Sequence, residues 1–134
     1  MRLLKKAQRF LMAGGIATTA HWLSMYMLIQ AGLVAEAATA VGAFIGLLVN
    51  YRLQHQFAFQ SSLQHRVAFP RYVSTSLLAW GLNLSLFSLL QMLGTHTVAS
   101  QVTTTGTVAL VNYLLADRFV FHEESGNDIE PPNA

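Results

Sequence analysis

The sequence predicts an all-α membrane protein in which four transmembrane helices form two helical hairpins. The first reason is composition: 53% of the residues are hydrophobic and 10% are charged, against about 25% charged in an ordinary soluble domain. The second reason is the distribution of charge, because residues 10–35 and 72–116 contain no Asp, Glu, Lys or Arg. A membrane span needs roughly 20 apolar residues, so the longer stretch has room for two spans and a turn.

The third reason is an internal repeat with a spacing of 62 residues. The segment LLVNYRLQHQFAF (47–59) matches ALVNYLLADRFVF (109–121), and both contain Val-Asn-Tyr followed by Phe-x-Phe. Each half has an even number of spans, so the halves share one topology and are parallel repeats. The sequence therefore predicts a single four-helix domain, 1–121, with halves at about 9–59 and 71–121. An acidic tail, 122–134, follows and is expected to be disordered.

Turn residues and polar breaks divide the apolar sequence into four spans. Gly32 and Gly94 mark two short turns. Pro70 precedes the third span and suits the start of a helix. The predicted spans are 10–30, 37–53, 72–92 and 98–116.

All the Lys and Arg residues fall at one end of these spans, and the two short turns contain none. The positive-inside rule places that end in the cytoplasm, together with both termini and the loop 54–69. The basic residues are Arg2, Lys5, Lys6, Arg9, Arg52, Arg66, Arg71 and Arg118.

Two polar residues are predicted to lie deep in the membrane. At about 1.5 Å per residue, His21 lies roughly 17 Å along the first span, near the middle of a bilayer core about 30 Å thick. The repeat places Asn83 at the same depth. Such residues often mark a substrate pathway. The alternative is structural, with His21 bonded to a nearby hydroxyl such as Thr18 and Asn83 tying helices together.

Asn50 and Asn112 occupy equivalent positions near the cytoplasmic ends of the second and fourth spans. An amide donates and accepts hydrogen bonds without carrying charge, so the pair is suited to holding a sugar hydroxyl or a phosphate oxygen. The alternative is that each Asn ties its helix to a neighbour. Gly42 and Gly46 share the face of Asn50 and favour close helix packing.

Four arginines gather at the predicted cytoplasmic boundary. A guanidinium binds phosphate through two parallel hydrogen bonds, so they are candidates for capturing a lipid phosphate. The alternative is that they only anchor the topology. Trp22 and Trp80 are interpreted as core residues, with stacking on a sugar ring as the alternative. The four arginines are Arg9, Arg52, Arg71 and Arg118.

The remaining residue types argue against several function classes. The chain has no cysteine, which excludes a disulfide or a thiolate nucleophile. The histidines lack metal-ligand spacing, and the sequence shows no nucleophile–base pair, no carboxylate pair within a span and no P-loop. We therefore expect no enzyme activity, no metal and no cofactor. The basic residues lie at span ends rather than in one soluble patch, so nucleic acid is not an expected partner.

Several segments together resemble the GtrA-like family over about residues 9–121. They are RFLMAGGIATTAHWL, the LLVNYRLQHQFAF end of the second span, the restart at RYV and the closing NYLLADRFVF. Asn50 and Asn112 match the Asn that the family has near the ends of spans two and four. The first span departs from the family pattern, with Ala17 and His21 where an Asn and an acidic residue are frequent.

The resemblance implies a multi-pass protein of the bacterial inner membrane, with both termini cytoplasmic, that flips a polyprenyl-phosphate-linked sugar for cell-envelope glycosylation. Expected partners are that lipid, a membrane glycosyltransferase and a second copy of the chain, because four helices enclose little space and the small-residue face could pack against a dimer partner. The predicted substrate-binding residues are Arg9, His21, Asn50, Arg52, Arg71, Asn83, Asn112 and Arg118.

Two alternatives remain open. One is a non-transporting accessory subunit of a glycosyltransferase. The other is a small multidrug-type transporter, although such exporters rely on an acidic residue in the first span, and no Asp or Glu lies within a predicted span here.

Overall fold

The computed structural model describes residues 1–123, so most of the predicted acidic tail, 124–134, lies outside the described residues. In this part of the chain, helices α2 and α4 each continue into a five-residue π-helical turn. The elements are α1 (Arg2–Gln30), α2 (Ala35–Leu53), η1 (Gln54–Ala58), α3 (His65–Met92), α4 (Thr97–Leu115) and η2 (Ala116–Val120).

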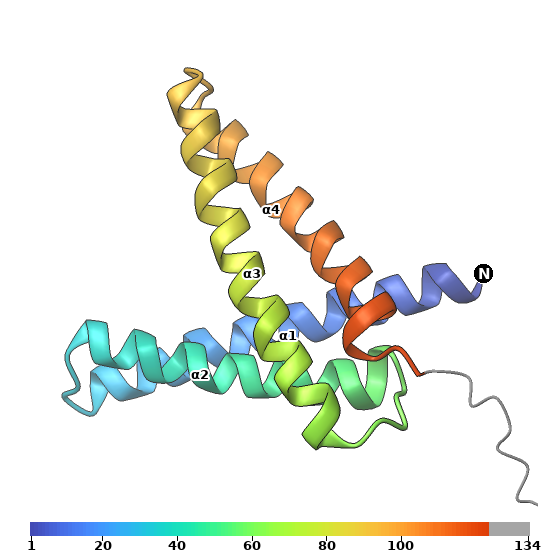
Figure 1. Cartoon of the computed structure of the whole chain (residues 1–134). Coiled ribbons are helices and arrows are strands. Elements are labelled where there is room, and N and C mark those ends of the chain that lie inside the picture. The colour runs from blue at the N-terminus through green and yellow to red at the C-terminus, as the bar shows by residue number, and fades with distance from the viewer. Residues whose placement is uncertain (124–134) are drawn as a thin grey trace, which may run out of the picture.

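The elements form two antiparallel hairpins built in the same way. The first hairpin contains α1, α2 and η1, and the second contains α3, α4 and η2 (Figure 1). The bounds of α2 and η1 recur in α4 and η2 with the 62-residue spacing of the sequence repeat. Both π-helical turns close with an N–H to O=C bond over five residues, from Phe59 to Gln54 at 2.9 Å and from Phe121 to Ala116 at 3.0 Å.

A glycine in the left-handed region makes each short turn. Gly32 has φ +97° and Gly94 has φ +79°. In the first turn, Leu33 N–H bonds the carbonyl of Leu28 at 3.0 Å, and Gly32 N–H bonds that of Ile29 at 3.0 Å. This pair of bonds is a Schellman motif, which satisfies carbonyls at the end of α1. The second turn repeats it.

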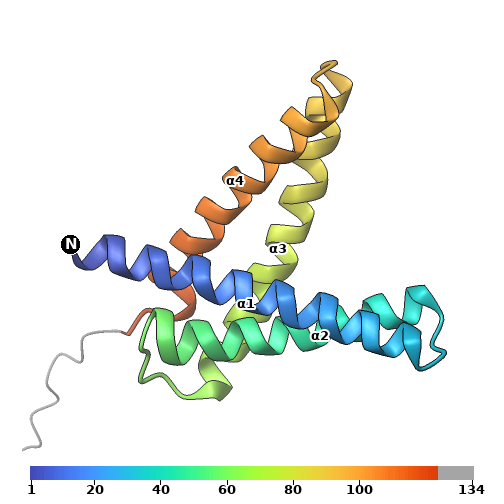
Figure 2. The ribbon, with the colours of Figure 1, turned by 180° about the vertical axis from the view of Figure 1, so that it is seen from behind.

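The two hairpins meet only at their base, where η1 and η2 lie, and then diverge so that their Gly turns lie far apart (Figures 1 and 2). Aromatic side chains from both hairpins fill the base. Tyr51 of α2 packs against Tyr72 of α3, with ring centroids 5.3 Å apart, and Phe59 stacks on Phe121 at 5.1 Å. The buried cluster comprises Tyr51, Ala68, Tyr72, Ala116, Val120 and Phe121.

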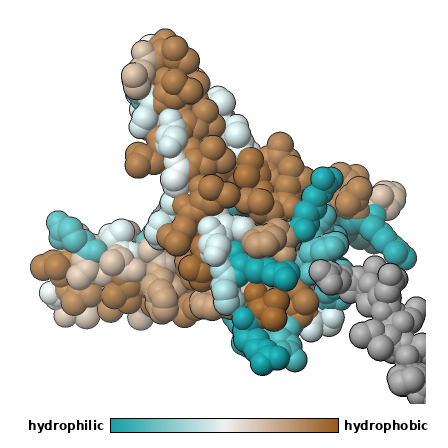
Figure 3. All heavy atoms as spheres, in the orientation of Figure 1, coloured by the Kyte–Doolittle hydropathy of each residue, from teal (hydrophilic) through white to brown (hydrophobic). Residues whose placement is uncertain are grey.

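Outside the base, large apolar side chains cover the helices. Leu11, Phe44, Leu78 and Leu84 are all more than half exposed, and brown apolar atoms cover much of the second hairpin in Figure 3. By length and composition, α3 is the one described helix that is able to cross a membrane. The apolar stretches of the other three helices have a lower mean hydropathy because of the polar residues that they contain.

Two sequence predictions about the third helix are wrong. Pro70 does not start the helix but lies inside α3, which begins at His65. The proline removes one intrahelical bond, while the preceding turn is held by Ala68, which is fully buried and bonds the carbonyl of Gln64 at 3.0 Å. The predicted loop 54–69 is correspondingly shorter, since η1 and the first turn of α3 occupy most of it.

Small residues on α2 allow it to pack closely on α1. A Cβ at Gly42 would lie 2.8 Å from the carbonyl oxygen of His21, and a Cβ at Gly46 would lie 3.1 Å from that of Ala17. Because α1 covers this face, it is not free for a dimer partner, and the argument that used it for a homo-oligomer is wrong. The homo-oligomer itself stays a prediction.

Candidate functional site

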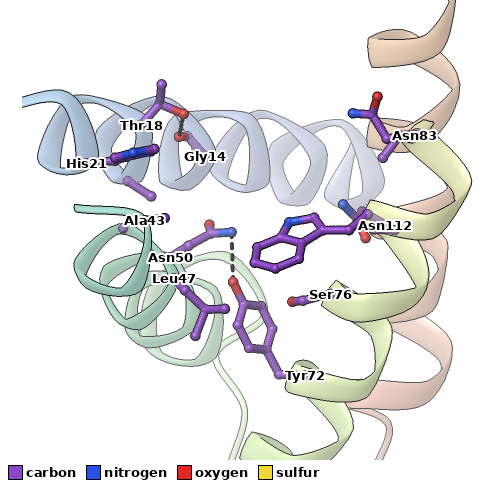
Figure 4. A pocket seen from close by; sticks show the side chains of 15 residues that line it. Gly14, Thr18, His21, Ala43, Leu47, Asn50, Tyr72, Ser76, Asn83 and Asn112 are labelled. Carbon is purple, nitrogen blue, oxygen red and sulfur yellow. Dashed lines mark hydrogen bonds between the residues drawn. The ribbon is translucent and has the colours of Figure 1, made fainter. Parts of the chain in front are cut away.

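A polar cavity of about 390 Å³ lies between the two hairpins, above their shared base. All four helices contribute to its walls, and Figure 4 shows Asn50, Tyr72 and Ser76 facing the space between the hairpins. Its volume falls within the range of roughly 300–1,000 Å³ typical of small-molecule sites. The lining contains no Asp, Glu, Lys or Arg.

The sequence repeat determines most of the lining. Twelve of the fifteen lining residues form six pairs that are 62 residues apart, so the two hairpins contribute equivalent positions to the cavity. Two of these pairs consist of residues predicted from the sequence. The six pairs are Gly14 with Ser76, Ala17 with Ala79, Thr18 with Trp80, His21 with Asn83, Gly46 with Val108, and Asn50 with Asn112.

Asn50 is held by two hydrogen bonds. Its Nδ2 donates to the hydroxyl of Tyr72 at 3.0 Å, drawn as a dashed line in Figure 4. Its Oδ1 accepts from Nε2 of Gln54 at 3.1 Å. The bond to Tyr72 ties α2 to α3 across the cavity wall. Asn50 therefore has the interhelical packing role that the sequence left open as the alternative.

Asn112 lies in a different environment although it is the repeat equivalent of Asn50. The counterpart of Tyr72 is Phe10, which has no hydroxyl and packs edge-on against Tyr113 with ring centroids 5.4 Å apart. Within residues 1–123 the Asn112 amide makes no hydrogen bond to another side chain, and it lines the cavity. Its donors and acceptor remain available to a ligand.

His21 also keeps a free polar atom. Its Nε2 is buried and has no hydrogen-bond partner among the described residues. The structural alternative that Thr18 satisfies His21 is wrong, because Thr18 donates to the carbonyl of Gly14 at 2.9 Å instead. Gly42 and Gly46 hold the ring in place by bringing the backbone of α2 against it.

The cavity extends toward the base as a second, narrow pocket of about 30 Å³, which has room for roughly one or two water molecules. Asn50, Tyr72, Ser76 and Asn112 line both spaces. Above the aromatic base, the two hairpins are thus separated by two adjoining spaces that share these four polar side chains.

Sequence reasoning missed three residues of this site and misjudged a fourth. Tyr72, Ser76 and Gln54 were not selected, although the mismatch between Tyr72 and Phe10 in the repeat was a visible signal for a polar partner of Asn50. Trp80 was interpreted as a core residue, but it lines the cavity and 61% of its surface is exposed.

The four predicted arginines do not line the cavity. Arg9 and Arg71 make the same contact in each half, with the guanidinium over a ring: Arg9 over Phe57 at 5.4 Å and Arg71 over Phe119 at 5.5 Å. Arg71 also donates to the carbonyl of Phe119 at 3.1 Å. Both residues therefore fix the π-helical turns to α1 and α3 through cation–π contacts.

The other two predicted arginines are exposed. Arg52 ends α2 and Arg118 lies in η2. Beside Arg118 in sequence, Asp117 forms an ion pair with Lys6 at 2.7 Å, which links the start of α1 to the end of the second hairpin. The basic end of the molecule is thus partly neutralised by contacts within the fold.

Comparisons with known proteins agree with this architecture. A family model described as GtrA/DPMS, transmembrane domain, matches residues 9–121. No curated protein and no solved structure matches the chain. The family match covers both hairpins and the whole cavity lining. The protein is therefore an all-helical membrane protein and belongs to the GtrA/DPMS transmembrane-domain family.

Proposed function

We propose that the protein translocates a polyprenyl-phosphate-linked sugar across the bacterial inner membrane, and that the sugar passes through the cavity between the hairpins. The observation that carries the proposal is the lining itself: three amides and one imidazole face one space without any charged side chain. A neutral polyol needs this environment, because amides donate and accept hydrogen bonds while adding no charge to desolvate.

The lipid tail needs no protein path because it is already soluble in the bilayer. The cavity is partly open rather than enclosed, and the hairpins diverge above their base (Figures 1 and 2). A tail attached to a sugar in the cavity can therefore remain in lipid. The phosphate is the costly group to move. The exposed side chain of Arg118 lies at the predicted cytoplasmic boundary, where the phosphate enters.

In this proposal, Asn112 is the main residue that hydrogen-bonds the sugar. His21 and Asn83, which are equivalent in the repeat, provide further hydrogen-bonding groups in the cavity. Asn50 positions Tyr72 and so shapes the wall. Trp80 offers an exposed aromatic face in the same lining. An indole face can stack on the apolar face of a sugar ring while the amides bind its hydroxyls.

Transport by the purified protein in liposomes tests the proposal. A polyprenyl-phosphate-linked sugar is placed in the inner leaflet, and its arrival outside is followed by oxidation with impermeant periodate. We expect the protein to accelerate transfer at least tenfold over empty liposomes and Asn112→Leu to abolish the acceleration. The matched control is Gln101→Leu, because Gln101 is an exposed amide on the same helix that bonds Thr105 at 3.0 Å outside the cavity.

The outcomes separate the proposal from its rivals. Normal transport by Asn112→Leu would show that the cavity is not the path. If the wild-type protein does not accelerate transfer, it acts as an accessory subunit of a membrane glycosyltransferase. A small multidrug-type transporter would instead move cationic dyes, which the uncharged cavity lining does not favour.

The proposed orientation has the base and both termini in the cytoplasm. The chain has no cysteine, so single cysteines can report on each side. With an impermeant thiol reagent applied outside cells, Thr95→Cys at the second Gly turn should be labelled and Ser62→Cys near the base should not. The reverse pattern would overturn the orientation.

A further inference from the structure

A second, open groove lies at the base on the outside of the molecule, where the end of α2 meets the start of α3. It has a volume of about 680 Å³ and is lined by Leu48, Tyr51, Arg52, His65, Arg66 and Phe69. Two guanidinium groups and an imidazole therefore share a groove with one aliphatic and two aromatic side chains. None of these six residues lines the polar cavity.

The groove and the cavity lie on different faces of α2. The cavity uses Ala43, Leu47 and Asn50 of α2, whereas the groove uses Leu48 and Arg52, which project from another face of that helix. A ligand in the groove is thus separated from the cavity by α2 itself. It lies on the surface that surrounding lipid would contact.

The repeat provides an internal comparison. The positions equivalent to Arg52, His65 and Arg66 are Leu114, Leu3 and Leu4, all exposed. The end of α2 and the start of α3 therefore carry cations at three positions where the end of α4 and the start of α1 carry leucines. Anchoring the topology does not explain this difference, because both positions lie at the same end of their helices.

The two arginines of the groove have fewer contacts within the fold than Arg9 and Arg71 have. Arg9 and Arg71 are held over phenylalanine rings. Among residues 1–123, the Arg66 side chain makes a hydrogen bond through Nε alone, which donates to Oε1 of Gln64 at 2.7 Å, so its terminal nitrogens make no hydrogen bond within this part of the chain. Arg52 is exposed. Two guanidinium groups in one groove can share a phosphate through bidentate bonds.

We infer that this groove binds the phosphate of an anionic phospholipid from the surrounding bilayer. Arg52 and Arg66 hold the phosphate, and Leu48 and Phe69 contact the glycerol and the first part of an acyl chain. The apolar half of the lining argues for a lipid rather than for free phosphate, which has nothing to place there. The site is independent of the translocation proposed above, because it lies outside the cavity.

Native mass spectrometry of the purified protein in mild detergent tests the inference by titration with phosphatidylglycerol, phosphatidylcholine, a polyprenyl monophosphate and inorganic phosphate. We expect one tight phosphatidylglycerol site, at least tenfold stronger than phosphatidylcholine. Arg52→Gln with Arg66→Gln should weaken it at least tenfold. The matched control, Arg2→Gln with Arg118→Gln, removes the same charge from exposed positions outside the groove and should change affinity less than twofold.

Replacement by lysine at both groove positions should restore binding only in part, because lysine lacks the bidentate fork. Equal losses in the groove pair and the control pair would overturn the inference, since binding would then follow net charge. Tighter binding of polyprenyl monophosphate than of phosphatidylglycerol would also overturn it, because the groove would then belong to the substrate. Asn112→Leu should leave this binding unchanged, which keeps the test separate from the transport assay.

Discussion

The two hairpins have the same backbone plan but use equivalent positions differently. Their helices and π-helical turns end 62 residues apart, and both short turns use a glycine with positive φ. The side chains diverge on this common backbone. Asn50 is bonded to Tyr72, while the other half has Phe10 at the position equivalent to Tyr72, and the Asn112 amide makes no side-chain hydrogen bond among the described residues. The two halves thus share one backbone arrangement, while their side chains at equivalent positions make different contacts.

Packing within the hairpins shows a similar contrast. In the first hairpin the buried face of α2 consists of Ala38, Gly42 and Gly46. In the second, the equivalent positions on α4 carry larger side chains, Ser100, Thr104 and Val108. The first hairpin therefore has the closer backbone approach, and it holds His21 beside the cavity. At the position of α3 that matches His21, the second hairpin carries the smaller Asn83, which lines the same cavity.

The largest effect on stability is expected from a substitution that disrupts the tight packing of the first hairpin. Gly42→Ala places a methyl group 2.8 Å from the carbonyl oxygen and 2.9 Å from Cδ2 of His21. Overpacking of this kind costs about 1–3 kcal/mol, so the melting temperature in detergent should fall clearly. Gly106→Ala on α4 is the control, because its added Cβ meets nothing within 4 Å.

That control should leave the melting temperature unchanged or slightly higher, since alanine favours helix. Equal destabilisation by the two substitutions would show that the hairpins do not differ in packing. Transport by the folded fraction of Gly42→Ala should also fall, because the ring of His21 has to move.

A smaller effect is expected from exchanging the partners of the two asparagines. Tyr72→Phe removes the hydroxyl that Asn50 binds and should cost about 0.5–1.5 kcal/mol of stability. Phe10→Tyr adds a hydroxyl at the equivalent place in the other half, where it can bind Asn112 and remove its amide from the cavity. We expect Phe10→Tyr to reduce transport and to leave the melting temperature unchanged.

The pair of substitutions is informative because each makes one half resemble the other. If Phe10→Tyr transports normally, a free amide at Asn112 is not required, and the contrast between the two asparagines has no functional meaning. If Tyr72→Phe leaves the melting temperature unchanged, the bond to Asn50 is not an interhelical tie. Both measurements use purified protein in one detergent, followed by the liposome assay.

Local features of the fold could be predicted from the sequence. The apolar runs and the two turn glycines predicted the four helices, and the match at Val-Asn-Tyr indicated the repeat. The same repeat placed His21 at the level of Asn83, and both line one cavity. These features depend on residues near each other in the chain or on simple spacing.

The remaining features depend on which side chains meet across the two hairpins, and periodicity does not report this. Asn50 and Asn112 look alike in sequence, yet their environments differ because one hydroxyl is present at Tyr72 and absent at Phe10. Arg9 and Arg71 looked free to bind phosphate, but the π-helical turns bring Phe57 and Phe119 beneath them. A one-residue widening of a helical turn has no clear sequence signal.

The smallest expected effect concerns the place where the ends of the two halves meet. Glu123 and Ser61 are repeat equivalents, and the serine hydroxyl donates to Oε1 of the glutamate at 3.4 Å. The backbone N–H of Ser62 donates to the same oxygen at 2.6 Å and is the main reason that the pKa of Glu123 lies below its ordinary value of 4.5.

A carboxylate whose pKa is lowered by folding stabilises the folded state when it is ionised. Its contribution is therefore complete above pH 4.5, the ordinary value, and disappears as the pH falls through the lowered pKa. Because Glu123 is fully exposed, solvent screens the effect and the change is small. The protection of the Ser62 amide, measured as its hydrogen exchange rate relative to the intrinsic rate at the same pH, should fall on acidification in the wild-type protein. In Glu123→Gln the protection should already be low and should show no such step, whereas an identical step in both proteins would show that Glu123 does not join the two halves.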